Sequence, residues 1–159
     1  MYTLVVVDMQ PRFVTTSAPM LVKACQREII MAKRRKAAII YLEFEGFGNT
    51  LGELTYFTHG YDKAYFATKN ADDGSRQVID LITKHNLYHN VRVIGVNTSY
   101  CVLSTIRGLM DYHGKITVVA DACNCYNHDF GLKRLADMNI KIIRGGPNIK
   151  KKIDRSLAL

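Results

Sequence analysis

The sequence has few cysteines and no long apolar run, and both shortages exclude classes of protein. Its longest uninterrupted apolar stretches are residues 4–7 and 37–42, far short of the roughly 20 residues that span a bilayer. Residues 1–3 carry no charged side chain and Asp8 interrupts the first apolar run, which is not typical of a signal peptide. The 4 cysteines are too few and too scattered for a disulfide scaffold. We therefore expect a soluble, cytoplasmic protein that binds no membrane.

Repeats and low-complexity segments are absent as well. A length of 159 residues predicts a single domain over residues 1–159. The hydrophobic fraction of 48% and the charged fraction of 23% are near globular averages, which excludes a disordered or fibrous chain.

The net charge of +8 is concentrated in two short segments. Residues 33–36 supply 4 positive charges, and a basic C-terminal tail from about residue 144 supplies a net 4 more. The first segment ends a predicted helix, where cations complement the helix dipole. Two local patches differ from a basic face interleaved with exposed aromatics. We therefore do not expect nucleic acid to be the partner.

Apolar runs alternate with helical patterns along the chain, which predicts α/β architecture. Helices are predicted from about residue 21 to 30, 75 to 86, 100 to 112 and 129 to 138. Six runs predict strands, at residues 2–7, 37–42, 63–68, 91–96, 116–120 and 140–143. Residues 45–60 are rich in glycine and aromatics and are predicted to form a loop. The expected fold is a three-layer α/β/α doubly wound structure with a mostly parallel six-stranded sheet.

Polar side chains follow most of these strands, where ligands bind in doubly wound folds. The crevice lies beyond the carboxyl ends of the strands, near the point where strand order reverses. We therefore expect several ionisable residues to converge on one edge of the sheet. The candidates are Asp8, Gln10, Glu43, Glu45, Lys69, Asn97, Thr98, Cys101 and Asp121.

Cys101 is the strongest candidate for a nucleophile. The chain leaves a buried strand, turns and enters a helix there, so unpaired helix N–H groups would favour the thiolate and could hold an oxyanion. The alternative is a small, buried apolar residue, as free cysteines usually are. The other cysteines, Cys25, Cys123 and Cys125, lack this setting.

The acid–base partner of Cys101 is expected on the same edge. Of the 5 histidines, only His59 and His128 lie in loops that could reach it. Asp8 and Lys69 are the better candidates, because each directly follows a predicted strand.

Three segments of the chain, at residues 5–13, 95–102 and 118–122, resemble motifs of the isochorismatase-like cysteine hydrolases. Residues 5–13, in which Asp8 ends the apolar run, resemble the opening motif of that family. Residues 95–102 resemble its nucleophile motif, and residues 118–122 resemble its fifth strand. The three occur in the family's order and together extend over most of the chain.

The resemblance implies an Asp-Lys-Cys triad. Asp8 would be the general base, Cys101 the nucleophile that forms a covalent intermediate, and Lys69 the supporting cation, with Lys63 as its alternative. It also implies a cis peptide between Val96 and Asn97 that directs N–H groups towards the oxyanion.

Aromatic and amide side chains near the expected site are candidates for binding substrate. They are Gln10, Phe13, Phe44 and Tyr100, with Phe47, Tyr56 and Phe57 as further lining. The alternative is that these aromatics pack in the core or at a subunit contact.

We expect no metal and no cofactor. Nicotinamidases of this family carry an Asp-x-His metal motif after the second strand, and this sequence has Glu43 and Glu45 there instead. Cys123, Cys125 and His128 supply only 3 ligands, without the paired spacing of a structural zinc site. The glycines at 46, 48 and 52 do not match the dinucleotide-binding spacing.

The sequence therefore predicts a metal-independent cysteine hydrolase that cleaves a C–N bond in a small amide substrate. Within the same family, cleavage of a vinyl ether is the alternative reaction. From another class, the alternative is a non-catalytic binding protein in which Cys101 is an oxidisable sensor. The resemblance also implies a homo-oligomer.

Overall fold

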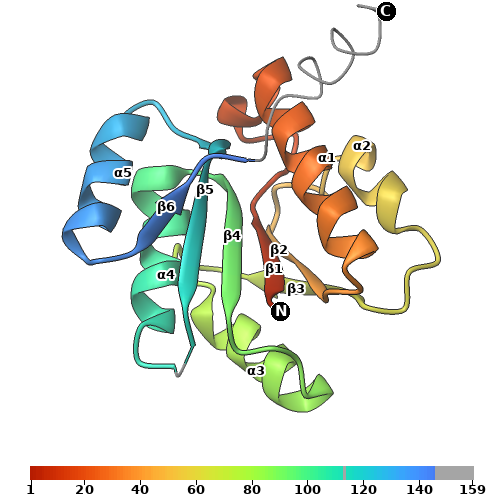
Figure 1. The fold of residues 1–159 in the computed structure, drawn as a ribbon. Coiled ribbons are helices and arrows are strands. Elements are labelled where there is room, and N and C mark those ends of the chain that lie inside the picture. Colours follow the sequence, from red (N-terminus) through yellow and green to blue (C-terminus); the bar gives the residue numbers. More distant parts are fainter. Residues whose placement is uncertain (113, 146–159) are drawn as a thin grey trace, which may run out of the picture.

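A six-stranded parallel sheet forms the centre of the structure, which is a computed structural model describing residues 1–112 and 114–145. Every neighbouring pair of strands is parallel, in the order β3-β2-β1-β4-β5-β6 (Figure 1). The strands are β1 (Thr3–Val7), β2 (Ile39–Phe44), β3 (Ala64–Lys69), β4 (Val91–Val96), β5 (Ile116–Asn124) and β6 (Lys141–Ile143). The expected fold class is confirmed.

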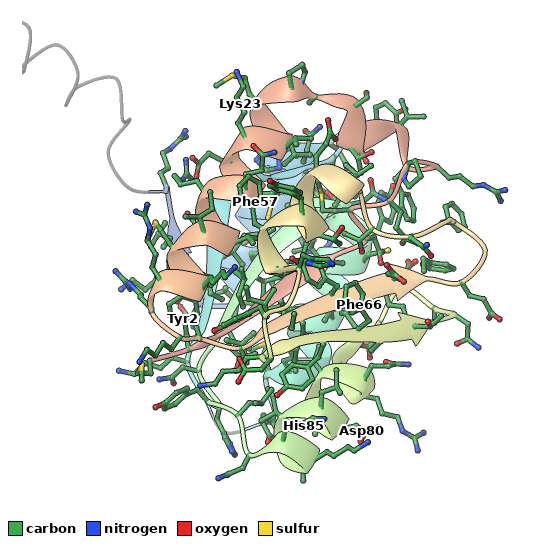
Figure 2. All side chains as sticks on the ribbon, turned by 90° about the vertical axis from the view of Figure 1, so that its right-hand side faces the viewer. Tyr2, Lys23, Phe57, Phe66, Asp80 and His85 are labelled. Atoms are coloured by element: carbon green, nitrogen blue, oxygen red, sulfur yellow. The ribbon has the colours of Figure 1, made fainter. Side chains whose placement is uncertain are left out.

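Helices cover both faces of the sheet (Figure 1). Leu4 and Val6 of β1 pack in the same core cluster as α1 (Pro19–Arg34) and α2 (Gly52–Thr55). Val5 and Val7 pack in the opposite cluster, with α3 (Ser75–His85), α4 (Leu103–Leu109) and α5 (His128–Asp137). Because successive side chains of a strand point to opposite faces, a continuous apolar run serves both layers. Figure 2 shows Asp80 and His85 on α3, away from Phe57 near α2.

Three short helical turns complete the described chain. They are η1 (Val14–Ser17), η2 (Tyr56–Thr58) and η3 (Thr98–Val102). The segment expected to be a loop at residues 45–60 thus contains α2 and η2. None of the helices in the described residues is long and apolar enough to span a bilayer. Beyond residue 145, the predicted basic tail lies outside the described residues.

Strand order reverses between β1 and β4. The chain runs outwards from β1 through β2 to β3, then returns to the other side of β1 as β4. In such sheets the ligand crevice opens at the carboxyl ends of the two central strands. Asp8 directly follows β1, and η3 begins two residues after the last residue of β4, so both lie at this point.

Candidate active site

Asp8 and Lys69 form a buried ion pair at the carboxyl edge of the sheet. Asp8 directly follows β1 with a positive φ of 52°, and Lys69 is the last residue of β3. The Oδ2 of Asp8 lies 2.9 Å from the Nζ of Lys69, and neither side chain is exposed to solvent. The lysine side chain therefore extends past β2, which separates β1 from β3.

Lys69 is held by further contacts around its ammonium group. Its Nζ donates to the carbonyl oxygens of Ala71 at 3.0 Å and Asp72 at 3.3 Å. It also lies 4.4 Å from the ring centroid of Phe44, which favours a cation. The alternative, Lys63, lies before β3 at the opposite edge, where its Nζ donates to the carbonyl of Lys36. Of the two lysines, the fold brings Lys69 to Asp8.

Cys101 lies beside both Asp8 and a second carboxylate. It is in η3 and is 3% exposed. Its Sγ donates to the Oδ1 of Asp72 at 3.6 Å. Asp8 is close enough to Cys101 for its charge, after burial, to raise the pKa of the thiol.

The site holds Cys101 as a neutral thiol in its resting state. Burial raises the pKa of Cys101, and the neighbouring charge of Asp8 raises it further, whereas Lys69 lowers it. Burial also raises the pKa of Asp8, and the charge of Lys69 opposes this rise. The sequence led us to expect that helix N–H groups and Lys69 would favour the thiolate. That expectation did not include the rise in the pKa of the thiol that burial and the charge of Asp8 cause.

Three hydrogen bonds, one from η1 and two from the start of α5, hold the turn that carries Cys101. The Oγ1 of Thr15 in η1 donates to the Oδ1 of Asn97 at 2.8 Å. The Oγ1 of Thr98 lies 2.8 Å from the Nδ1 of His128, at the start of α5. Ser99 donates to the carbonyl of Asn127 at 3.0 Å. The peptide bond between Val96 and Asn97 is cis, so this turn begins with the backbone geometry that the resemblance implied.

Aromatic side chains form a wall next to Lys69. Phe13 stacks on Phe47 with 4.5 Å between ring centroids, and Phe44 packs edge-on against both. Tyr100 lies in the same turn as Cys101 and is 55% exposed. Of the predicted substrate contacts, Phe44 thus lies against Lys69, Phe13 packs on Phe44, and Tyr100 shares the turn of Cys101.

Gln10 and two of the predicted lining aromatics take other positions. Gln10 is fully buried, and its amide donates to the carbonyls of Phe44 and Gly48 and accepts from the N–H of Phe44. This geometry gives Gln10 the task of fixing the loop after β2, in place of the predicted substrate contact. Tyr56 and Phe57 pack on each other, in η2, away from the ion pair.

The residues considered for a metal do not assemble into a ligand set. The carboxylate of Glu43 accepts from the N–H and the hydroxyl of Thr50. His128 contacts Thr98, and Cys125 donates to Asn127. In residues 1–112 and 114–145, no group of three or more His, Cys, Asp or Glu side chains is placed to hold a metal ion.

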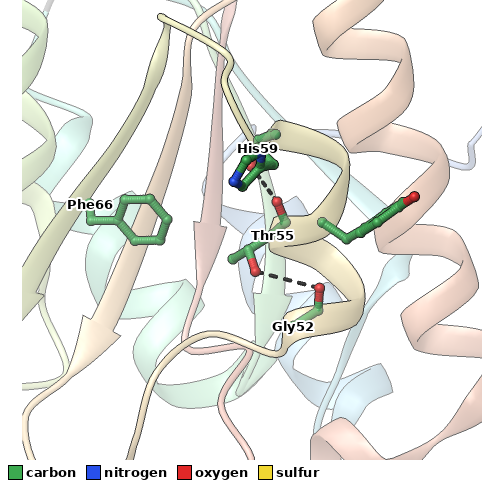
Figure 3. Close-up of a pocket in the computed structure, with 6 residues that line it drawn as sticks. Gly52, Thr55, His59 and Phe66 are labelled. Carbon is green, nitrogen blue, oxygen red and sulfur yellow. Dashed lines mark hydrogen bonds between the residues drawn. The ribbon is translucent and has the colours of Figure 1, made fainter.

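A small cavity lies beside η1, and a larger one lies beside α2. One of about 190 Å³ opens between η1 and the end of β5 and is lined in part by Thr15 and Asn124. A larger one of about 760 Å³ lies between α2, η2 and Phe66 of β3. Figure 3 shows His59, Thr55 and Phe66 around it. His59 thus lines a cavity formed by none of the three candidate catalytic residues.

Sequence reasoning missed two residues of the site and the role of a third. Asp72 was not among the candidates, although its place three residues after Lys69 brings it back towards the sheet edge. Thr15 was not singled out, because nothing in its own segment indicates a contact with Asn97. His128 was considered as an acid–base group or a metal ligand, not as a partner of Thr98.

The fold has counterparts among solved structures. MAR1 ribonuclease from Caenorhabditis elegans superposes with a TM-score of 0.80 at 20% identity, covering 99% of this chain and 88% of that one. The nicotinamidase SaPncA from Staphylococcus aureus gives 0.72 at 19% identity, covering 90% of this chain and 100% of that one. YcaC from Escherichia coli, described as an octameric hydrolase of unknown specificity, gives 0.77 at 16%, with 90% and 74% covered.

These identities are low enough that the likeness shows the fold alone. A search of curated protein sequences gave no match for this chain. The sequence model of the Isochorismatase domain, however, matches residues 2–145. That match extends from the start of β1 to the end of the described chain and includes the segments that carry Asp8, Lys69 and Cys101. The chain therefore belongs to the Isochorismatase domain family of hydrolases.

Proposed function

We propose that this protein is a metal-independent cysteine hydrolase that cleaves the C–N bond of a small amide. The observation that carries the proposal is the position of Asp8, whose carboxylate contacts the ammonium of Lys69 and whose charge, after burial, raises the pKa of the Cys101 thiol. A nucleophile, a base and a cation that orients the base are the parts that acyl transfer needs.

Asp8 acts as the general base in the first half of the reaction. As the Sγ of Cys101 attacks the amide carbonyl, its proton passes to Asp8 and a C–S bond forms. The carbonyl oxygen becomes an oxyanion next to the N–H groups of η3. Collapse of this intermediate breaks the C–N bond, and Asp8 returns the proton to the leaving amine. A thioester remains on Cys101.

Water completes the reaction. Asp8, again ionised, accepts a proton from the water that attacks the thioester. The C–S bond then breaks, the acid is released and the thiol of Cys101 is restored with the proton from Asp8. The ammonium of Lys69 stabilises the ionised Asp8 before each proton transfer.

Burial of the thiol favours this function over redox sensing. A sensor cysteine is accessible and has a low pKa, whereas Cys101 is 3% exposed and its pKa is raised. A neutral thiol with an adjacent carboxylate suits a nucleophile that loses its proton only when substrate arrives.

The test uses p-nitrophenyl acetate as a generic acyl donor, with nicotinamide and other small primary amides as substrates. We expect a burst of p-nitrophenol, an acetyl group on the Cys101 peptide by mass spectrometry, and its later loss by hydrolysis. Cys101→Ala should abolish the burst, and Cys25→Ala is the matched control that should retain it. An undiminished burst in Cys101→Ala, or equal acetylation of all four cysteines, would refute the proposal.

A further inference from the structure

Cys101 has a second carboxylate on its solvent side. The Oδ1 of Asp72 lies 3.6 Å from the Sγ of Cys101. Asp8, the other carboxylate that acts on this thiol, is fully buried, whereas Asp72 is exposed. A molecule that approaches the sulfur from solvent therefore meets Asp72 before it meets Asp8.

The backbone of Asp72 is fixed in this position. Its carbonyl accepts from the Nζ of Lys69 at 3.3 Å and from the Oγ1 of Thr105 at 3.4 Å. Thr105 in turn accepts from the N–H of Gly74 at 3.0 Å. A Cβ on Gly74 would lie 2.8 Å from side-chain atoms of both Leu42 and Lys69, so the turn packs tightly on the lysine. The placement of Asp72 is built into the site.

The charge of Asp72 is not balanced within the described residues. The ammonium of Lys69 pairs with the carboxylate of Asp8, and it contacts Asp72 only through the backbone carbonyl. Residues 1–112 and 114–145 contain no ion pair to the Asp72 carboxylate. Asp8 thus has a cation as its partner, whereas the Asp72 carboxylate beside Cys101 has none within the described residues.

We propose that Asp72 determines substrate specificity: it admits neutral or cationic substrates with N–H donors near the scissile bond and disfavours substrates with a carboxylate there. An N–H or ammonium group can replace the thiol as the hydrogen-bond partner of Asp72 when Sγ turns towards the carbonyl carbon. A substrate carboxylate would be repelled across a short distance. This inference rests on the proposed function, because it names the substrate class of the same site.

Charged thiol reagents test the inference without a known substrate. Aminoethyl, hydroxyethyl and sulfonatoethyl methanethiosulfonate have similar size but carry a positive, zero and negative charge. Each transfers its thioalkyl group to the thiolate of Cys101 and releases methanesulfinate. The rate at the Cys101 peptide is measured by mass spectrometry and divided by the rate of the same reagent with free cysteine. All three reagents react with the same thiolate. The ratio of the normalised rate of the cationic reagent to that of the anionic reagent therefore does not change when a substitution alters the fraction of Cys101 that is ionised.

We expect a ratio that favours the cation in the unaltered protein and falls about tenfold in Asp72→Asn. In Asp72→Lys the preference should reverse. Asp80→Asn is the matched control, because it makes the same charge change at an exposed site in α3 (Figure 2). It should leave the ratio unchanged.

The failures of the two proposals are distinguishable. If Cys101 reacts but the ratio is the same in all four proteins, the role of Asp72 is overturned and the hydrolase proposal stands. If the neutral reagent labels Cys101 in the unfolded protein and never in the folded one, the hydrolase proposal loses its nucleophile, and the role of Asp72 falls with it.

Discussion

Asp8 and Lys69 are joined by a 2.9 Å contact from which solvent is fully excluded. Each charge depends on the other, because an unpaired charge in such a place would lack both water and a partner. The pair therefore links the stability of the fold to the base that we propose for catalysis. It also links β1 to β3 across the end of β2.

A double-mutant cycle should reveal this dependence. Lys69→Met and Asp8→Asn are each expected to lower the free energy of unfolding by about 3–5 kcal/mol, because each leaves one buried charge unpaired. The double variant should lose clearly less than the two single losses added together. Denaturant unfolding monitored by circular dichroism measures all four proteins.

The matched control for the cycle is Lys63→Met. Lys63 is exposed at the other end of β3, so its removal should change the free energy of unfolding by no more than about 0.5 kcal/mol. Strict additivity of the Asp8 and Lys69 variants would show that the two side chains do not depend on each other.

The pH dependence of acyl transfer should reflect the raised pKa of Asp8. Only the ionised carboxylate accepts a proton, so the burst rate should fall with decreasing pH at values above the ordinary carboxyl range. Lys69→Met should move this acid limb to still higher pH, because the charge that lowers the pKa of Asp8 is removed. An acid limb at ordinary carboxyl pH in both proteins would contradict the assignment of Asp8.

The same shift predicts a change in stability with a defined sign. The pKa of Asp8 is higher in the folded state than its ordinary value of 3.8, so the folded protein binds this proton more tightly. The contribution of Asp8 to stability should therefore rise as pH falls through the raised pKa towards 3.8. Comparison with Asp8→Asn isolates this contribution from those of other carboxyl groups.

The sequence predicted the central strands well because their burial is uniform. β4 runs from Val91 to Val96, as expected, since all of its residues except Arg92 are buried. β2 begins at Ile39, two residues after the expected start, because apolarity alone does not separate a buried approach from a paired strand. β5 continues to Asn124 through a register shift against β4. The sequence predicted that this strand ends at residue 120, because polar residues interrupt the apolar run beyond that point.

The geometry around Cys101 was beyond the reach of sequence patterns. The position of Cys101 after β4 was foreseeable from strand order, and so was that of Asp8 after β1. The raised pKa of the thiol was not, because it depends on burial and on the distance to Asp8. The contact with Asp72 depends on how the turn after Lys69 folds back, and local composition does not encode that direction.

Thr98 should matter through its hydrogen bond with His128. Thr98 is fully buried and the bond is 2.8 Å long, so Thr98→Val leaves a half-buried imidazole without this partner. Burial lowers the pKa of His128, so the ring that loses the bond is neutral at neutral pH. We expect a loss of about 1–3 kcal/mol in stability and a burst rate lower by roughly tenfold, since the nucleophile turn is less well held.

Thr98→Ser is the matched control for this prediction, because it keeps the hydroxyl and removes only the methyl group. It should retain most of the burst rate. If Thr98→Ser and Thr98→Val lose the same activity, packing of the methyl group, and not the contact with His128, positions the turn.

Gly95 should tolerate no side chain. Its φ is +122°, and a Cβ there would lie 2.1 Å from the carbonyl oxygen of Val7 in the adjacent strand. Gly95→Ala would therefore force β1 and β4 apart beside Asp8, and we expect it to cost more than about 3 kcal/mol in denaturant unfolding. Gly52→Ala is the control, since a Cβ there meets no atom within 4 Å. Equal stability of the two variants would mean that β1 and β4 approach less closely than the structure indicates.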